Sequence, residues 1–249
     1  MTSQIVVIPT RRAHSNHEEV ARSIGVDIIA GRYGEGAKLP GDAELTVLFG
    51  VSRPVLRESV KTLVAKGLLS TKARVGTVVR ERAAWNMFDP DVLAWHLDAG
   101  INKRFLRDLA EIRLAVEPRA AALAAERRSV EDIRLMRDAV GRMARENSRK
   151  PDGSRSDGFA EADLSLHLHV AIASGNPFMR SIGAVVEAAL RASFVLSAPA
   201  DDREFQISVA AHERIVDAIE DGDGEAAASA MANVIFTGLR RHGAAGEVK

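Results

Sequence analysis

An aspartate and a histidine stand four residues apart, at Asp163 and His167, in a stretch whose apolar residues recur with helical spacing. Side chains four apart share one face of a helix, and the apolar neighbours turn that face inward. A second histidine, His212, lies on a similar apolar face further along the chain. Carboxylate and imidazole groups inside a helical bundle bind divalent metals. These three residues are a candidate metal site; the alternative is a hydrogen-bonded Asp163–His167 pair and an ordinary core histidine.

Two arginines, Arg53 and Arg57, are also four residues apart, directly after a serine that can begin a helix. Pro54 is tolerated in the first turn of a helix, and Ser52 is a favoured residue at its start. Arginines at the leading end of such a helix can reach base edges or phosphates in the major groove. A pair of arginines on one face is, by itself, more often a solvated surface, so the interpretation depends on the surrounding elements.

Those elements follow the order helix, helix, helix, hairpin. The spacing predicts helices over 18–30, 42–50 and 53–66 and strands over 68–71 and 76–80. The second and third helices are joined only by residues 49–51, which include Gly50, and this is a tight helix-turn-helix connection. The hairpin is the wing, with Lys72, Arg74 and the backbone of Gly76 at its tip as further candidate DNA contacts.

Composition is consistent with this interpretation. The 249 residues are 46% hydrophobic and 4% aromatic, contain no cysteine and carry no net charge. Residues 1–80 hold 12 Lys and Arg against 7 Asp and Glu, whereas the remainder holds 22 against 27. A basic module joined to an acidic partner is typical of nucleic-acid binding. Disulfides and thiolate sites are excluded. With no secretory signal and no apolar run of bilayer length, we expect a soluble protein of the cytoplasm, associated with the nucleoid.

The chain is predicted to be mainly α-helical. After a linker over 81–101, helices are expected over 102–127, 130–147, 159–174, 177–197, 203–221 and 224–242. The expected organisation is a flexible arm (1–17), a winged helix-turn-helix (18–80), the linker, an all-helical bundle of six to seven helices (102–243) and a tail (244–249).

The N-terminal motifs resemble one known family. They are Leu39-Pro40-Gly41-Asp42-x-Glu44-Leu45, Phe49-Gly50-Val51-Ser52-Arg53-x-x-Leu56-Arg57-Glu58, Leu63-x-x-Lys66-Gly67-Leu68 and Gly76-Thr77-x-Val79. This ordered set resembles the winged helix of the GntR superfamily. The resemblance implies operator binding through Ser52, Arg53, Arg57 and the wing. Ala43 stands where many relatives carry a DNA-contacting arginine.

The C-terminal part resembles the FCD effector domain of the FadR subfamily. Matching stretches include Leu109-x-Glu111-x-Arg113-x-x-x-Glu117-Pro118, Asp163-x-x-x-His167, Ser174-Gly175-Asn176-Pro177 and His212-x-x-Ile215. The resemblance implies a divalent metal, zinc or alternatively nickel or manganese, on Asp163, His167 and His212. It also implies Arg113 and Asn176 as effector contacts; for Arg113 a plain salt bridge is the alternative. Val234 stands where a fourth histidine ligand is usual, which leaves three protein ligands.

The linker sequence Trp85-Asn86-x-x-Asp89-x-Asp91-Val92-Leu93-x-Trp95 resembles repressors that respond to sugar acids, of the galactonate type. We therefore expect a homodimeric repressor that binds double-stranded operator DNA and a small carboxylate effector, and no enzyme. Three alternatives stay open: another effector, such as a dicarboxylate or an acyl-CoA; a metal-dependent enzyme; and a constitutive DNA binder whose C-terminal domain only dimerises.

Overall fold

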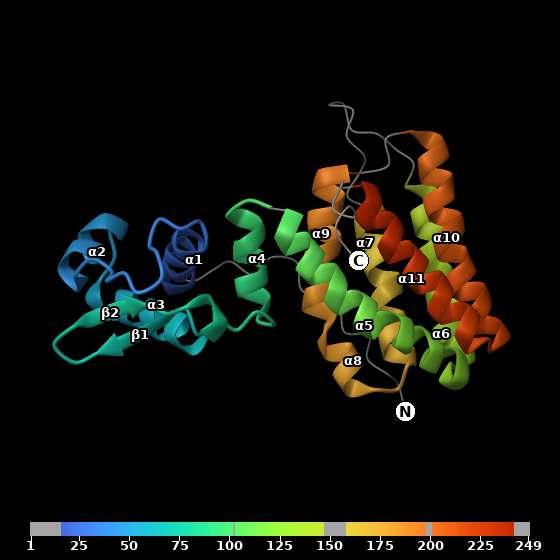
Figure 1. Cartoon of the computed structure of the whole chain (residues 1–249), viewed down its shortest axis with the longest axis horizontal. Helices are drawn as coiled ribbons and strands as arrows, with labels where there is room; N and C mark the ends of the chain where they lie inside the picture. Colours follow the sequence, from blue (N-terminus) through green and yellow to red (C-terminus); the bar gives the residue numbers. More distant parts are fainter. Residues whose placement is uncertain (1–15, 102, 147–157, 198–200, 242–249) are drawn as a thin grey trace. The chain divides into compact units, whose positions relative to one another are not determined.

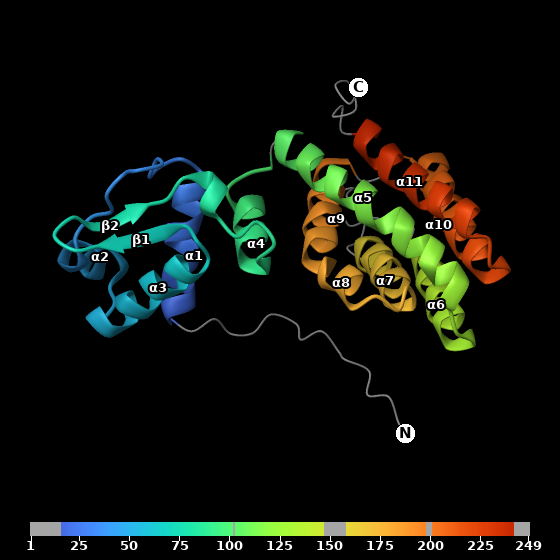
Figure 2. The same cartoon turned by 60° about the horizontal axis from the view of Figure 1, so that its bottom comes forward.

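The computed structural model describes residues 16–101, 103–146, 158–197 and 201–241 (Figures 1 and 2). The chain divides into two compact units, residues 1–99 and 100–249, and each has its own hydrophobic core. The expected tail lies outside the described residues, as does the expected arm except for residues 16 and 17, which begin the first helix. No described helix is long and apolar enough to cross a membrane.

The N-terminal unit contains the predicted winged helix-turn-helix. Its first elements are α1 (Asn16–Ile29), α2 (Asp42–Phe49), α3 (Arg53–Ala65), β1 (Leu69–Lys72) and β2 (Gly76–Val79), and the two strands are antiparallel. Gly50 joins α2 to α3 at φ 62°, where its N–H donates to the carbonyls of Thr46 and Val47. Glycine adopts this left-handed conformation without a steric penalty, so the connection can be tight.

The wing has a third, shorter member that the sequence analysis did not predict. Residues 36–39 run along β2: the N–H of Gly36 donates to Val79, and that of Leu39 to Thr77, at 3.0 and 2.9 Å. Lys38 forms an antiparallel bridge with Val78. β2 therefore lies between β1 and this segment.

Most of the expected linker is folded into the N-terminal unit. It forms the short helix η1 (Arg82–Ala84) and α4 (Pro90–Asp98), and its two tryptophans belong to the core of that unit. The ring of Trp95 lies against Gly25 of α1, where a built Cβ would come within 2.3 Å of it. The ammonium of Lys66, which ends α3, contacts the carboxylates of Asp89 and Asp91, both at 2.7 Å. The linker motif thus connects α4 to α1 and α3.

The described part of the C-terminal unit is all helical, as predicted. Its seven helices are α5 (Lys103–Arg127), α6 (Val130–Arg145), α7 (Gly158–Ala173), α8 (Pro177–Ser181), α9 (Gly183–Ser197), α10 (Asp202–Asp221) and α11 (Gly224–Arg241). The single helix expected over 177–197 is divided near Ile182. The long helices α5 and α11 pack side by side, and α10 packs against α11 and α6 (Figures 1 and 2).

Candidate functional site

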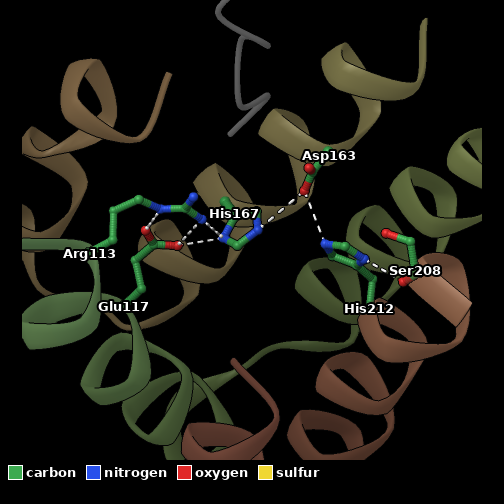
Figure 3. A network of polar contacts seen from close by, with 6 residues as sticks. All are labelled: Arg113, Glu117, Asp163, His167, Ser208 and His212. Atoms are coloured by element: carbon green, nitrogen blue, oxygen red, sulfur yellow. Dashed lines mark hydrogen bonds and ion pairs between the residues drawn. The ribbon is translucent and has the colours of Figure 1, made fainter. Parts of the chain in front are cut away.

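Three of the predicted site residues meet inside the C-terminal unit. Asp163 and His167 lie on α7 and His212 on α10. The Oδ1 atom of Asp163 is 3.2 Å from Nε2 of His167 and 3.1 Å from Nε2 of His212 (Figure 3). One ligand atom from each residue lies within 4.8 Å of the others. Both histidines are buried, and the Asp163 side chain is 14% exposed.

The opposite nitrogen of each imidazole is held by an acceptor. Nδ1 of His212 donates to the carbonyl of Ser208 at 2.7 Å, and Nδ1 of His167 lies against a carboxylate oxygen of Glu117 (Figure 3). Because carbonyl and carboxylate oxygens only accept hydrogen bonds, the proton of each neutral ring is on Nδ1. Each Nε2 then directs a lone pair toward Asp163. Histidine ligands of metals are commonly oriented in this way.

The three candidate ligand atoms are buried without a hydrogen-bond partner among the described residues. Among the described residues, Asp163 Oδ1, His167 Nε2 and His212 Nε2 have no partner with hydrogen-bond geometry, although their mutual distances are short. Such a cluster needs a positive charge at its centre, which a proton on an imidazole supplies in the metal-free chain and a bound metal cation can supply instead. One carboxylate and two imidazoles are a donor set that zinc accepts. The residues therefore fit the metal that the sequence implies.

Charge around the histidines is balanced by a buried network. Arg113 donates to Glu117 through Nε at 2.5 Å and through Nη2 at 3.3 Å. Burial alone would raise the pKa of Glu117, but Arg113 and His167 outweigh it and lower this pKa to about 2. Burial likewise opposes ionisation of Asp163, yet His212 and His167 hold its pKa well below the usual range. Both carboxylates are thus ionised.

A cavity of about 140 Å³ adjoins the cluster. Its lining includes Arg113, Asp163, His212 and the half-buried Val234. The predicted effector residue Arg113 therefore lies at the same cavity as two of the metal ligands, while it also forms the salt bridge considered as its alternative. Asn176 has a different role: it is absent from the lining, and its side-chain oxygen accepts from the N–H of Phe178 at 3.0 Å to begin α8.

The predicted DNA-reading residues lie at the start of α3. Arg53 and Arg57 are exposed, and neither forms an ion pair with any residue that the structure describes. Ser52 occupies the N-cap position, but its hydroxyl does not cap the helix, and Pro54 is in the first turn. The exposed hydroxyl and the free N–H groups of the first turn are suited to a phosphate oxygen.

At the wing, Lys72, Arg74 and Gly76 are all exposed. Arg74 has φ 63° and Gly76 has φ 103°, so the turn between the strands is built from left-handed conformations. A positive φ is uncommon for arginine and is found at tight turns and functional sites. The turn places cationic side chains at the wing tip.

Comparison with known proteins decides the family. Residues 16–79 match the family described as "Bacterial regulatory proteins, gntR family", and residues 108–236 match the FCD domain. The chain belongs to the GntR family. It is a DNA-binding transcription regulator with an FCD domain, and not an enzyme.

Relatives align with most of the GntR chain. It is 31% identical to the galactonate operon transcriptional repressor of Escherichia coli K12, over 90% of this chain and 95% of that protein. It is 33% identical to the HTH-type transcriptional regulator YieP of the same organism, over 84% and 87%. A solved structure of Lar, which controls the agr system of Listeria monocytogenes, has the same fold with a TM-score of 0.60, covering 93% of this chain and 98% of that one at 16% identity.

The sequence analysis did not identify Lys38 as a candidate DNA contact of the wing. A Cβ built at Gly76 would lie 2.9 Å from Cε of Lys38, so the lysine side chain crosses the wing beside this glycine. Lys38 pairs with Val78, which pairs with Ser70, and Lys72 is two residues further along β1. Paired residues and residues two apart share a face of a sheet, so Lys38 and Lys72 lie on one face. The segment 36–39 is too short to show a strand pattern in sequence.

The role of Glu117 was also missed, although it was quoted within the FCD motif. Its spacing from Arg113, four residues on one helix, was the available signal. Only the fold shows that the same carboxylate also contacts His167, fifty residues away in sequence.

Proposed function

We propose that this GntR regulator is a repressor of an operon for the catabolism of a sugar acid or a related small carboxylate, and that the effector binds at a metal held by Asp163, His167 and His212. The observation that carries the proposal is the convergence of three unsatisfied ligand atoms beside a cavity that also contains Arg113. The relative that represses a galactonate operon supports the same class of effector.

Zinc suits the three ligands, with nickel or manganese as alternatives. Bound there, the metal supplies a Lewis acid that can hold carboxylate and hydroxyl oxygens at positions the protein leaves open. Arg113 is placed to pair with the effector carboxylate. A cavity of about 140 Å³ with this lining favours a small polar acid or dicarboxylate over an acyl-CoA.

The N-terminal unit reads the operator. We infer that Arg53 and Arg57 reach base edges or phosphates in the major groove, that Ser52 and the first turn of α3 bind phosphate, and that the wing residues contact the neighbouring backbone. As a homodimer, the protein would place its two recognition helices on the halves of a near-palindromic site about one helical turn apart. It would act in the cytoplasm, at the nucleoid.

Control requires that the effector bind two states unequally. Arg113 and Glu117 lie on α5, which begins at Lys103, only a few residues after α4 ends at Asp98. Because α4 is part of the core that includes α1 and α3, a shift of α5 on effector binding would act on the DNA-reading unit through this short connection. For repression, the effector would favour the state with poor spacing of the two recognition helices.

The metal site is tested by zinc titration of chelator-treated full-length protein. We expect one zinc per chain, and galactonate should raise the Tm only when zinc is present. His167→Ala should abolish both effects. His169→Ala is the matched control, because His169 lies on the same helix but contacts the Ser165 carbonyl and is not one of the three clustered ligands. Zinc binding that survives in His167→Ala would contradict the assigned ligands.

DNA reading is tested by fluorescence anisotropy with operator DNA. Arg57→Ala should weaken binding by about 1–3 kcal/mol if the arginine makes a bidentate base contact. Arg32→Ala is the control, because that guanidinium is paired with Asp27. Equal affinities of the two variants would remove Arg57 from the reading surface.

A further inference from the structure

Helix α11 contributes a regular polar stripe to the cavity. Asn233, Thr237 and Arg241 all belong to the lining and are spaced by four residues. Residues four apart share a helix face, and the rise of about 1.5 Å per residue spreads this stripe over about 12 Å. The wall therefore presents an amide, a hydroxyl and a guanidinium in sequence. None of these was identified as an effector residue from the sequence.

The guanidinium end of the stripe is far from the metal ligands. Nη2 of Arg241 approaches the carbonyl of Glu204, near the start of α10, at 3.4 Å. His212 lies eight residues further along α10, which corresponds to about 12 Å along its axis. Both Arg241 and His212 line the same cavity. A ligand that reaches both must be extended.

The guanidinium at this end forms no ion pair with a described residue, although the first turn of α10 beside it carries Asp202 and Glu204. The ionisable residues of the lining are Arg113, Asp163, His212, Arg214 and Arg241. Arg113 is neutralised by Glu117, and Asp163 faces the two histidines. In the part of the chain that the structure describes, Arg241 contacts only a carbonyl oxygen at long distance and forms no ion pair. An anionic ligand group can complete its hydrogen bonds.

We propose that the effector is a dianion: a polyhydroxylated carbon chain with a carboxylate at the metal and Arg113 and a second anionic group at Arg241. Asn233 donates to and accepts from the hydroxyls between these ends, and Thr237, whose oxygen already accepts from Arg240 at 3.1 Å, donates to them. This inference rests on the proposed metal-dependent effector site and narrows its ligand class. The second anionic group is a carboxylate or a phosphate, since a guanidinium binds either one bidentately.

Three probes with the same six-carbon skeleton distinguish the possibilities: galactonate, with one anionic end, and galactarate and galactonate 6-phosphate, with two. Calorimetric titration of the zinc-loaded full chain should give an affinity at least tenfold higher for one of the dianions than for galactonate. Arg241→Gln should reduce that affinity by about tenfold or more and reduce the affinity for galactonate much less. Whichever dianion shows this behaviour identifies the second group.

Arg203→Gln is the matched control. Arg203 is exposed in the first turn of α10, next to Glu204, and is absent from the lining. Arg203→Gln therefore removes one positive charge close to the Arg241 contact without changing the cavity. It should keep the preference for the dianion. The Tm of each variant without ligand verifies folding.

Equal affinities for galactonate and both dianions, or a preference that Arg241→Gln does not change, would overturn the dianion proposal while the metal-dependent site stands. If zinc binds but none of the three acids does, the proposed sugar-acid effector fails and the dianion proposal fails with it. An Arg241→Gln variant that loses unliganded stability but keeps the full preference would show that Arg241 only stabilises the end of α11.

Discussion

At the scale of single residues, His167 links the metal to pH. Burial alone would lower its pKa, but Glu117 and Asp163 raise it to about 9 in the metal-free chain, from an ordinary value of 6.5. A protonated imidazole cannot bind metal, so zinc must displace this proton. Below pH 9 the apparent zinc affinity should therefore rise by about tenfold per pH unit, and above pH 9 it should level off.

The stability of the metal-free chain should have the opposite dependence. A raised folded-state pKa means that the folded chain binds the proton more tightly than the unfolded chain. This stabilisation is complete below pH 6.5 and is lost as the pH rises to about 9. The gain in Tm on adding zinc should consequently grow from pH 6.5 to pH 8.5, measured by thermal melts with and without zinc. A zinc affinity that is flat over this range would show that His167 releases no proton.

Val234 offers a gain-of-function test of the same site. It lines the cavity together with Asp163 and His212. It also stands where the resemblance to the FCD domain implies a fourth histidine ligand. Val234→His should complete a four-ligand site and raise zinc affinity by at least about tenfold, because tetrahedral zinc prefers four donors. It should also weaken galactonate binding by occupying an open position. Val234→Leu is the control, because it enlarges the side chain without adding a metal ligand. An equal zinc affinity in both variants would show that residue 234 does not reach the metal.

At the scale of elements, the wing should carry more phosphate contacts than its two strands suggest. Lys38, on the segment beside β2, shares a face with Lys72. Lys38→Gln should reduce the slope of log K against log salt concentration by about 0.9, the value for one phosphate contact. Lys61→Gln, whose ammonium is paired with Glu58 at 2.7 Å, should keep the slope. If the two variants have identical slopes, Lys38 makes no phosphate contact.

Helix α4 is predicted to be integral to the N-terminal unit. Helix propensity alone would make Gly25→Ala stabilising by about 0.5–1 kcal/mol. A Cβ at this position would lie 2.3 Å from the Trp95 ring, so we expect instead a loss of about 1–3 kcal/mol in the free energy of unfolding. Gly34→Ala, in open space at an ordinary φ, should change stability by less than about 0.5 kcal/mol. Denaturant unfolding measures both, and a stabilised Gly25→Ala would mean that α4 moves freely from α1.

The sequence predicts the positions of the helices better than the contacts between distant helices. Helical periodicity and turn glycines such as Gly50 and Gly222 located nearly every helix within a few residues, because local spacing determines which face is buried. The linker was harder to interpret, since Trp85 and Trp95 are buried in a core that includes residues of α1 and α3, which are distant in sequence. The metal ligands were found because Asp163 and His167 lie on one helix. The Glu117 contact and the Arg241 end of the cavity depend on packing between distant helices.

At the scale of the whole molecule, function requires communication between two units with separate cores. The connection between α4 and α5 is short, and Gly100, at φ 108°, lies within it. The side chains of the metal cluster come from α5, α7 and α10. An effector that draws these helices together would therefore move α5, the helix that directly follows this connection. Binding of the metal, the effector and the operator should therefore be thermodynamically linked.

The most direct test is the affinity for operator DNA of the zinc-loaded full chain, followed by fluorescence anisotropy as galactonate or galactarate is added. The acid should weaken operator binding of the native protein and of His169→Ala by at least about tenfold, within the usual range of allosteric coupling. His167→Ala should bind the operator with native affinity and ignore the acid. An acid response that persists in His167→Ala, or that is absent from the zinc-loaded native protein, would contradict control of DNA binding through the metal site.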